Sequence, residues 1–587
     1  MEMNWRHTHA RRLALLTLAA MGIAGAADPP QANIRLNGDK YVVTQWRSSG
    51  PARFEFESPE LTASIVDAGG GQWSFELNPR QSVQEVWFPW EPQQIVLNSD
   101  MSDDVVLTPK FGGTACRMDS LMEWGWNGNL YPGVSFSPLL IVTDRRSARV
   151  AAATNWPPRN LTPMYSRNRI TLVSHEPLPP GRKQTYSILY ASYPHDAAAG
   201  GEPWQKPVEV FREWLQSKLR SENLFPPRYS QTLQETPGWL NVQLQNSPRF
   251  DPRYLEQFHE RWHGEFPWIQ FWGQMSNYTG QAALARPAVK PGEECGCCVG
   301  RRELHARYRP DLPRLIDQFR AAGTRVGFYA RPRDPLDLQR LDDPTLREGV
   351  SHLDWMREWV RQNCEDHHAE AIYLDTIGNV CFAATPLFVA RVLGEPKFAD
   401  AIVEGVEDLY PSAFLGSGFL SGGFNVGERG KPAEANKEPS FVRFSRYLLN
   451  EHVFFFGESN GDHKHWGAAN DHRVEREAFL LGAKLDVITP TQKPEQTLGP
   501  INAALGEILT TWREVGFWQR RPVYEDTRGI RNVPPGVRVR RFRGSRGEVL
   551  LAIENWSRAA GQQAVLDGAP IAIPTRRLSI VVVGGGE

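Results

Sequence analysis

The sequence predicts a multidomain α/β plus β protein with an N-terminal β-sandwich, a central (β/α)8 TIM-type barrel and a small C-terminal β-sandwich. The chain of 587 residues is longer than a single hydrophobic core usually supports. Strand patterns fill both ends of the chain, and a strand, loop and helix rhythm repeats between them. After a leader at 1–27 we expect the sandwich at 28–198, a helical connector at 199–235, the barrel at 236–522 and the C-terminal β-domain at 523–587.

The first of these observations concerns the strand patterns. Apolar and polar residues alternate in short runs at 53–57, 62–66, 72–77 and 187–191, and turn-forming residues separate the runs. This alternation is typical of half-buried strands and favours a sandwich. A stripe of apolar residues over 207–219 predicts a helix that connects and packs between domains. Strand patterns return at 537–539, 548–553 and 578–583, which predicts the C-terminal β-domain.

The second observation is the alternation of strands and helices in the middle of the chain. Seven strands are expected at 239–244, 268–272, 325–330, 371–375, 413–415, 453–456 and 485–488, and an eighth is left open near 515–518. Helical stripes stand between them, for example over 312–319 and 402–409. Such a count favours a closed parallel barrel, with a doubly wound open sheet as the alternative. No Gly-rich turn supports a dinucleotide fold.

The first 27 residues have the pattern of a signal peptide. Arg6, Arg11 and Arg12 precede an apolar run over 13–23, and small residues follow up to Ala26. The run is shorter than the roughly 20 residues that a membrane span needs. We therefore expect an exported protein, periplasmic or secreted after cleavage near Ala26. The Arg11–Arg12 pair agrees with twin-arginine export but is common by chance.

The charge balance excludes several classes of partner. The chain holds 66 Lys and Arg against 67 Asp and Glu, a net charge of −1. This balance gives no basic surface for nucleic acid and no polybasic membrane anchor, and no later segment predicts membrane insertion. The oligomeric state stays open.

Six cysteines follow the leader: Cys116, Cys295, Cys297, Cys298, Cys364 and Cys381. An even number in an exported protein favours disulfides, whose connectivity the sequence leaves open. The Cys295–Cys298 cluster lacks the second spaced pair of a zinc site, so metal binding is the less favoured alternative there. We expect no cofactor.

Candidate catalytic residues follow from the position of active sites in barrels, at the carboxyl ends of the strands. Asp375 ends the predicted fourth strand after the apolar run Ile372–Leu374. A carboxylate there suits a nucleophile, although it could also cap a loop or pair with Arg331. Glu458, with Asp462 as second choice, leaves the predicted sixth strand and would be the acid/base. Two carboxyl groups facing one another across the barrel mouth are what glycosidic cleavage requires.

Several further side chains at the strand ends could contact a substrate. Aromatic rings suit stacking against sugars, and arginines suit a sugar carboxylate, although these arginines could also keep Asp375 ionised. The histidines near residue 465 lack a recognisable metal spacing, so substrate contact or a surface role is preferred. The substrate-binding candidates are Trp268, Trp272, Tyr329, Arg331, Arg333, Asp334, His463, His465 and Trp466.

The layout with Tyr373-Leu374-Asp375 on the fourth strand resembles the glycoside hydrolases of the α-galactosidase-like clan. It also resembles poorly characterised bacterial glycoside-hydrolase-like proteins with a Tyr-Leu-Asp fourth strand. The resemblance implies that Asp375 is the nucleophile and that Glu458 or Asp462 is the acid. The sequence departs from typical α-galactosidases because Tyr-Leu-Asp replaces their Lys-x-Asp and the second strand lacks Asp-Asp-Gly-Trp. Galactose is therefore not implied as the sugar.

These observations together predict an exported glycosidase that cleaves an oligo- or polysaccharide by a two-carboxylate, retaining mechanism. Two alternatives remain. One is a non-catalytic glycan-binding protein on a degenerate barrel, because a fold does not fix an activity. The other is a metal-dependent hydrolase that uses the cysteine or histidine clusters.

Overall fold

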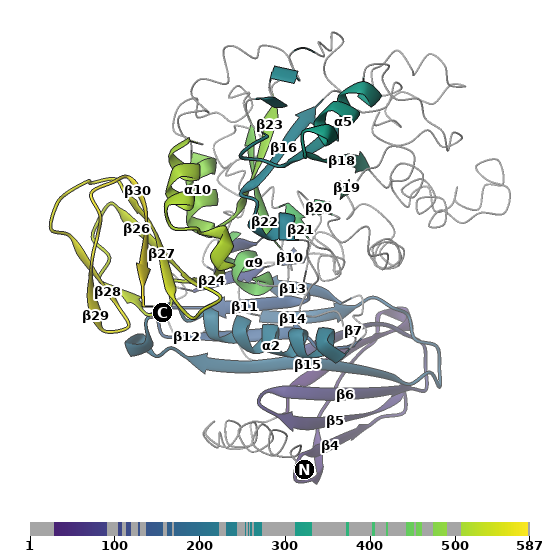
Figure 1. Ribbon diagram of the computed structural model, residues 1–587. Coiled ribbons are helices and arrows are strands. Elements are labelled where there is room, and N and C mark those ends of the chain that lie inside the picture. The colour runs from purple at the N-terminus through teal and green to yellow at the C-terminus, as the bar shows by residue number, and fades with distance from the viewer. Residues whose placement is uncertain are drawn as a thin grey trace, which may run out of the picture.

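The computed structural model describes part of the chain. The described residues are 29–90, 104–108, 113–118, 127–128, 137–156, 161–166, 169–221, 231–243, 253, 256–257, 259–260, 263–272, 312–330, 371–374, 402–404, 418–420, 442–450, 454–460, 473–489 and 506–584. The protein is mostly β and has several domains (Figure 1).

Two antiparallel sheets form the N-terminal region. The first has the order β10 (Asn127–Gly128), β13 (Thr162–Ser166), β14 (Arg169–Ser174), β7 (Val83–Trp90), β1 (Gln31–Leu36), β2 (Tyr41–Val43). The second has the order β3 (Arg47–Gly50), β4 (Arg53–Glu57), β5 (Leu61–Gly69), β6 (Gln72–Pro79), β15 (Gln184–Pro194), β12 (Ser147–Ala153), β11 (Leu139–Thr143), β8 (Val105–Thr108), β9 (Thr114–Arg117).

The two sheets pack face to face around one apolar core. Ile34 and Phe88 from the first sheet lie in the same buried cluster as Ile65, Phe75 and Ile188 from the second. In β6 every second residue is buried, which is the alternation that the sequence showed. Short 3-10 turns occur at η1 (Asn37–Asp39) and η3 (Ala197–Ala199).

Helix α2 (Gln205–Ser221) follows the sheets and extends beyond the predicted stripe by two residues at each end. Its buried face carries Val208, Phe211, Leu215 and Leu219 at spacings of three and four. The helix contacts β12 and β15 of the second sheet and also helix α9 (Val442–Leu449). Figure 1 shows it lying across the face of that sheet. It therefore packs between the sandwich and the next region.

Eight parallel strands pair in a closed ring. Their order is β16 (Gly238–Gln243), β17 (Trp268–Trp272), β18 (Arg325–Ala330), β19 (Ala371–Leu374), β20 (Ile402–Glu404), β21 (Gly418–Leu420), β22 (Phe454–Asn460), β23 (Lys484–Thr489), and β23 pairs with β16. The helices described in this region are α3 (Gln231–Glu235), α5 (Leu312–Ala321), α9, α10 (Arg473–Leu481) and a helix over 506–514. Regular strand–helix alternation between β18 and β21 stays a prediction, because those connections lie outside the described residues.

Three sequence predictions for the ring were wrong. Ile402 and Val403 lie in strand β20 instead of the predicted helix, because adjacent β-branched residues before Gly405 suit a short strand better than a helix. Gly418–Leu420 forms strand β21, although this stretch is not among the seven expected strands. The eighth strand is Lys484–Thr489, while residues 515–520 form a turn and η11 (Trp518–Arg520). The predicted strand at 413–415 lies outside the described residues.

The C-terminal region consists of a second pair of sheets. The larger has the order β24 (Val523–Asp526), β26 (Val537–Arg543), β27 (Val549–Asn555), β30 (Leu578–Val583), and the smaller β25 (Ile530–Arg531), β28 (Gln563–Leu566), β29 (Ala569–Ala572). Val539, Leu551 and Ile553 from the larger sheet share a core with Ala564 and Leu566 from the smaller. In the described part of the chain, no helix combines the length and apolarity that a membrane crossing requires.

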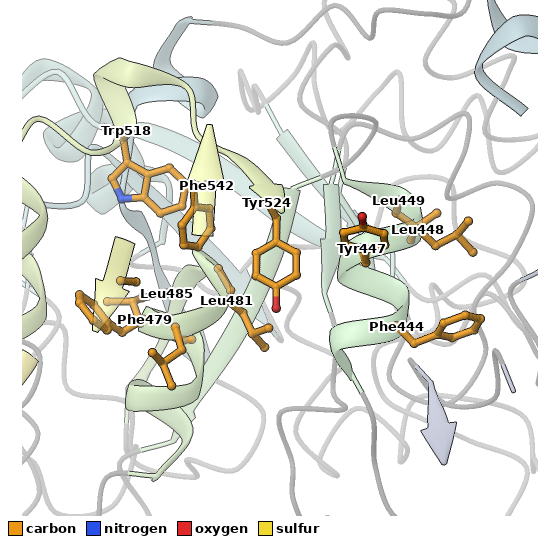
Figure 2. Close-up of a cluster of buried hydrophobic side chains, with 14 of the residues drawn as sticks. Phe444, Tyr447, Leu448, Leu449, Phe479, Leu481, Leu485, Trp518, Tyr524 and Phe542 are labelled. Atoms are coloured by element: carbon orange, nitrogen blue, oxygen red, sulfur yellow. The ribbon is translucent and has the colours of Figure 1, made fainter. Parts of the chain in front are cut away.

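A single apolar cluster connects all of these regions. It includes Ile141 of the sandwich, Phe211 of α2, Phe444 of α9, Leu485 of the ring and Phe542 of the C-terminal sheet. Figure 2 shows its central part, where Tyr524 lies between Tyr447 and Phe542. The ring centroids of these pairs are 6.5 Å and 5.4 Å apart.

Candidate functional site

The carboxyl ends of the ring strands define the expected site. Every pairing in the ring is parallel, so these ends gather at one end of it. Asp375 follows Leu374, the last residue of β19, and Arg331 follows Ala330, the last residue of β18. The register pairs Ala330 with Leu374. Asp375 and Arg331 themselves lie outside the described residues, and their roles stay predictions.

Glu458 lies within β22, two residues before the strand ends at Asn460. In register it pairs with Asp486 of β23. Because β20 and β21 are both strands, β22 is the seventh strand of the ring, and the prediction that Glu458 leaves the sixth strand was wrong. Two strands still separate β19 from β22, so the two carboxylate-bearing strands are not neighbours.

Most other predicted contact residues cannot be placed as side chains. Trp272 is the last residue of β17 and Tyr329 the penultimate residue of β18, and only their backbone is described. The other predicted residues, which lie outside the described part of the chain, are Asp462, Arg333, Asp334, His463, His465 and Trp466.

Trp268 is placed, and it is unsuited to sugar stacking. It begins β17, at the opposite end of the strand from Trp272, and its side chain is completely buried. Its ring meets that of Trp239 edge to face at 5.3 Å, and the Arg325 guanidinium lies 5.7 Å from its centre. Large apolar side chains of this kind fill cores more often than they bind ligands. Trp268 therefore belongs to the core at the amino-terminal end of the ring.

The same end of the ring shows how its first and last strands join. Gly238 of β16 lies so close to the Leu485 carbonyl of β23 that a Cβ atom would overlap it. The buried Lys484 ammonium donates to the Thr236 carbonyl and lies 3.9 Å from the centre of the Trp518 ring. The Thr236 hydroxyl donates to the Gly238 carbonyl over 2.6 Å. These contacts close the ring and leave the opposite end for a site.

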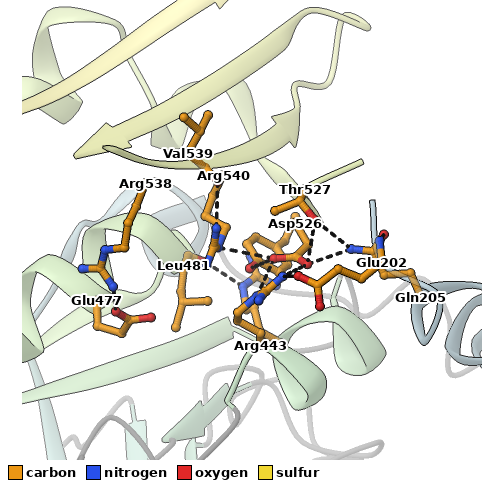
Figure 3. A network of polar contacts seen from close by, with 12 residues as sticks. Glu202, Gln205, Arg443, Glu477, Leu481, Asp526, Thr527, Arg538, Val539 and Arg540 are labelled. Carbon is orange, nitrogen blue, oxygen red and sulfur yellow. Dashed lines mark hydrogen bonds and ion pairs between the residues drawn. The ribbon is translucent and has the colours of Figure 1, made fainter. Parts of the chain in front are cut away.

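A buried ionic network lies beside helix α9, where the α2 region and the C-terminal sheet meet it (Figure 3). Arg443 of α9 pairs with Glu202, before α2, and with Asp526 of β24. Arg540 of β26 lies 3.3 Å from the same Asp526 carboxylate, and Gln205 of α2 donates to it over 2.7 Å. Three regions of the chain therefore meet at one carboxylate.

The pKa values in this network follow from burial and charge. Burial opposes the ionisation of Asp526, but Arg443 and Arg540 outweigh it and lower the pKa of its carboxyl to about 2. Burial, with the charge of Asp526, raises the pKa of Tyr524 well above its usual value. Perturbed groups often mark active sites, yet these interact with one another in a structural ion network. Sequence reasoning missed the network, because its partners are 83 and 241 residues apart and form no motif.

Among the described residues, no group of three or more His, Cys, Asp or Glu could hold a metal ion. The Cys295–Cys298 cluster and the histidines at 463, 465 and 472 lie outside that part of the chain, as do all cysteines except Cys116. Cys116 lies on β9 and is partly exposed. The disulfides expected from the sequence therefore stay a prediction.

Comparison with solved structures identifies a shared fold. One match is an α-N-acetylgalactosaminidase from Bifidobacterium bifidum that was solved with GalNAc, and its sequence is 12% identical to this chain. The match covers 90% of this chain and 93% of the enzyme, with a TM-score of 0.55. A family 36 α-galactosidase from Geobacillus stearothermophilus with raffinose is 10% identical over 96% of this chain and 90% of its own, with a TM-score of 0.47. A family 31 α-xylosidase from a soil metagenome with xylose is 8% identical over 92% and 98%, with a TM-score of 0.46.

No protein-family model and no curated protein matches the chain. At 12% identity the likeness to the first of these enzymes concerns the fold. That likeness extends over most of both chains. The chain therefore resembles the glycoside hydrolases in its fold, as its sequence predicted.

Proposed function

We propose that this protein is a glycoside hydrolase that cleaves a glycan by a retaining, two-carboxylate mechanism. One observation carries the proposal: in a fold shared with a glycosidase, an aspartate directly follows the fourth strand of a closed ring of parallel strands. In such rings the catalytic groups come from the carboxyl ends of several strands. Fold alone leaves the activity open, so the proposal depends on Asp375 and its partner.

The register of β18 and β19 supports Asp375 as the nucleophile. Ala330, the last residue of β18, pairs with Leu374, the last residue of β19. In the sequence Arg331 follows Ala330, and Asp375 follows Leu374. A nucleophilic carboxylate must be ionised, and a guanidinium nearby favours the ionised form. Arg331 would therefore keep Asp375 charged at neutral pH.

In the proposed reaction the Asp375 carboxylate attacks the anomeric carbon and forms a covalent glycosyl ester. The bond to the leaving oxygen breaks as Glu458 donates its proton to that oxygen. Glu458 then takes a proton from water, whose oxygen attacks the same carbon and releases Asp375. Retention requires the two carboxyl groups to be about 5 Å apart. Asp462, two residues beyond β22, is the second candidate for the acid.

The proposed substrate is an oligo- or polysaccharide. The α-N-acetylgalactosaminidase of similar fold was solved with GalNAc, and a sugar in the same place is the natural expectation here. Trp272 and Trp466 would stack against sugar rings. Hydrogen bonds to hydroxyl groups would come from Tyr329, Arg333, Asp334, His463 and His465.

We further propose that the chain is exported and that residues 1–27 are removed as a signal peptide. The five segments expected from the sequence, with boundaries at 27, 198, 235 and 522, are proposed as the domain division. The strand pairing supports a (β/α)8 barrel as the catalytic domain.

The decisive experiment incubates the native protein with a broad polysaccharide library and identifies products by mass. Asp375→Asn should then lose at least about a thousandfold in kcat, because the nucleophile is gone while the shape remains. Asp317→Asn, on the exposed face of α5, is the matched control and should keep native turnover. Full turnover by folded Asp375→Asn would eliminate the nucleophile assignment.

A second pair of variants separates the two candidates for the acid. The variant that removes the true acid should spare aryl glycosides with acidic phenol leaving groups, which need no protonation, and lose activity on natural linkages. We expect this behaviour from Glu458→Gln and a smaller, uniform loss from Asp462→Asn. The reverse pattern would transfer the role to Asp462.

A further inference from the structure

Helix α9 is the element that leads into β22, the strand with Glu458. Asn450 follows the helix, and only residues 451–453 separate it from Phe454 at the start of the strand. Because only three residues intervene, the end of the helix lies within roughly 14 Å of the start of the strand. What holds α9 in place therefore bears on where Glu458 lies.

The first turn of α9 is held by the C-terminal β-domain. The Arg443 guanidinium donates to both oxygens of Asp526, to Oδ1 over 2.9 Å through Nε and to Oδ2 through Nη2. Asp526 is completely buried, and it also accepts from the Tyr524 hydroxyl over 2.7 Å. A two-pronged contact of this type fixes direction as well as distance.

The last turn of α9 is held by the same strand, β24. The Asn450 side chain donates to the Tyr524 carbonyl over 2.8 Å and accepts from the Tyr524 amide over 2.9 Å. Asn450 therefore pairs with the backbone of β24 as a neighbouring strand would. Between the two ends, Arg446 donates to the Leu481 carbonyl of α10 over 2.9 Å.

Helix α2 is bonded to α9 as well. The Tyr447 hydroxyl donates to Glu209 over 2.6 Å, and Arg212 donates to the Tyr447 carbonyl over the same distance. With α2 and β24 both bonded to it, α9 cannot slide along its axis without breaking several buried polar contacts. Buried polar groups that lose their partners are costly, so the position of the helix is strongly determined.

We propose that Asp526 and Asn450 are positioning residues. By binding α9 to β24 they fix the position of β22 along the axis of the ring, and with it the position of the Glu458 carboxyl group relative to the substrate. This inference rests on the proposed function for its catalytic consequence. A slip of one residue along a strand is about 3.3 Å. A misplacement of about 1 Å at a reacting group can cost about a hundredfold in rate.

The test compares Asp526→Asn with Asp567→Asn. Asparagine has the shape of aspartate and tolerates the left-handed backbone of residue 526 (φ 56°), so the change removes the charge and one of the two acceptor oxygens without changing the shape. Asp567 belongs to the same domain, its backbone is also left-handed (φ 48°), and it also pairs with an arginine, but its side chain is 56% exposed. It is the matched control.

The primary readout is hydrogen exchange of the full-length protein in the peptide that contains residues 454–460. Asp526→Asn should raise exchange there about tenfold under conditions where the protein stays folded. On a glycan that the native enzyme cleaves, kcat should fall about tenfold with KM almost unchanged. Asn450→Asp, which keeps the acceptor but removes the donor to Tyr524, should act in the same direction. Asp567→Asn should alter neither quantity.

Unchanged exchange at 454–460 in both folded variants overturns the inference, even if their melting temperatures fall. Raised exchange with native kcat also overturns it, since β22 would then be loosened without effect on the reaction. A native protein that cleaves no glycan refutes the proposed function instead. In that case exchange alone decides whether the C-terminal domain fixes β22.

Discussion

At the scale of single residues, burial controls the charge of His259. The imidazole Nε2 lies 2.6 Å from the Thr324 hydroxyl, and its ring stacks on Phe319 with centroids 4.0 Å apart. Burial, and to a smaller extent the charge of His263, lowers the pKa of His259 to about 4. The neutral ring is therefore the form that the fold accommodates.

This histidine should make stability depend on pH. Its pKa is lower in the folded chain than the 6.5 of an unperturbed histidine, so below pH 6.5 the unfolded chain binds a proton that the folded chain does not. The contribution of the neutral His259 ring to the free energy of unfolding is complete above pH 6.5 and is lost as the pH falls towards 4. This loss is about 2 kcal/mol after allowance for partial solvent screening. Urea unfolding at pH 7 and pH 4.5 should show this loss in the native protein and a smaller one in His259→Gln.

His175→Gln is the control for this prediction, because that histidine is half exposed beside Glu85. Its loss of stability between the two pH values is the reference for that of His259→Gln. If native and His259→Gln proteins lose equal stability between the two pH values, His259 does not titrate on unfolding.

At the scale of elements, sequence patterns located strands of five or six residues and failed for strands of three. The predicted strand at 268–272 matches β17, and 325–330 matches β18, because apolar runs between turn residues leave little choice. The three-residue strands β20 and β21 were missed. Three residues cannot display a period, and the pairing partners that make them strands come from elsewhere in the chain.

The missed strands also explain the error about the site. The number of the strand that carries the predicted acid depended on a count. Two short strands lie between β19 and β22, where one strand was expected, so Glu458 belongs to the seventh strand instead of the sixth. Its chain neighbourhood, an apolar run followed by polar residues, was still recognisable. The local sequence can thus indicate which carboxylate lies near the end of a strand. Which residue lies opposite it depends on how all eight strands close into the ring.

Helix α2 carries a prediction at this scale. Phe211 is 1% exposed and its ring lies 5.3 Å from that of Trp214, in the cluster that joins sandwich and ring. Phe211→Ala should reduce the free energy of unfolding by about 3–5 kcal/mol through lost burial and the cavity that remains. Ser217→Ala, on the exposed face of the same helix, should change it by less than about 0.5 kcal/mol. Urea denaturation measures both, and equal effects would mean that α2 is not a core element.

At the scale of the whole molecule, the regions share one interior. The cluster that contains Ile141, Phe211, Leu485 and Phe542 extends from the sandwich to the C-terminal sheet. Ionic contacts add to it at the C-terminal side, where Arg538 of β26 pairs with Glu477 of α10 over 2.6 Å. Interfaces between domains are ordinarily smaller and more polar, which lets domains move and unfold separately. Here the connecting helix is part of the core.

A shared interior predicts that the sandwich, the ring and the C-terminal sheets unfold together. Opening any one region would expose Phe211, Tyr524 or Phe542 to water and leave Arg443 without the carboxylate of Asp526, so a partly unfolded state should be higher in free energy than either end state. Far-UV circular dichroism and tryptophan fluorescence should therefore give one coincident urea transition. Hydrogen exchange in β6, β22 and β27 should rise at the same urea concentration. If exchange in β27 rises at a lower urea concentration than exchange in β6 and β22, the C-terminal domain unfolds on its own. The regions would then be independent folding units in spite of the shared cluster.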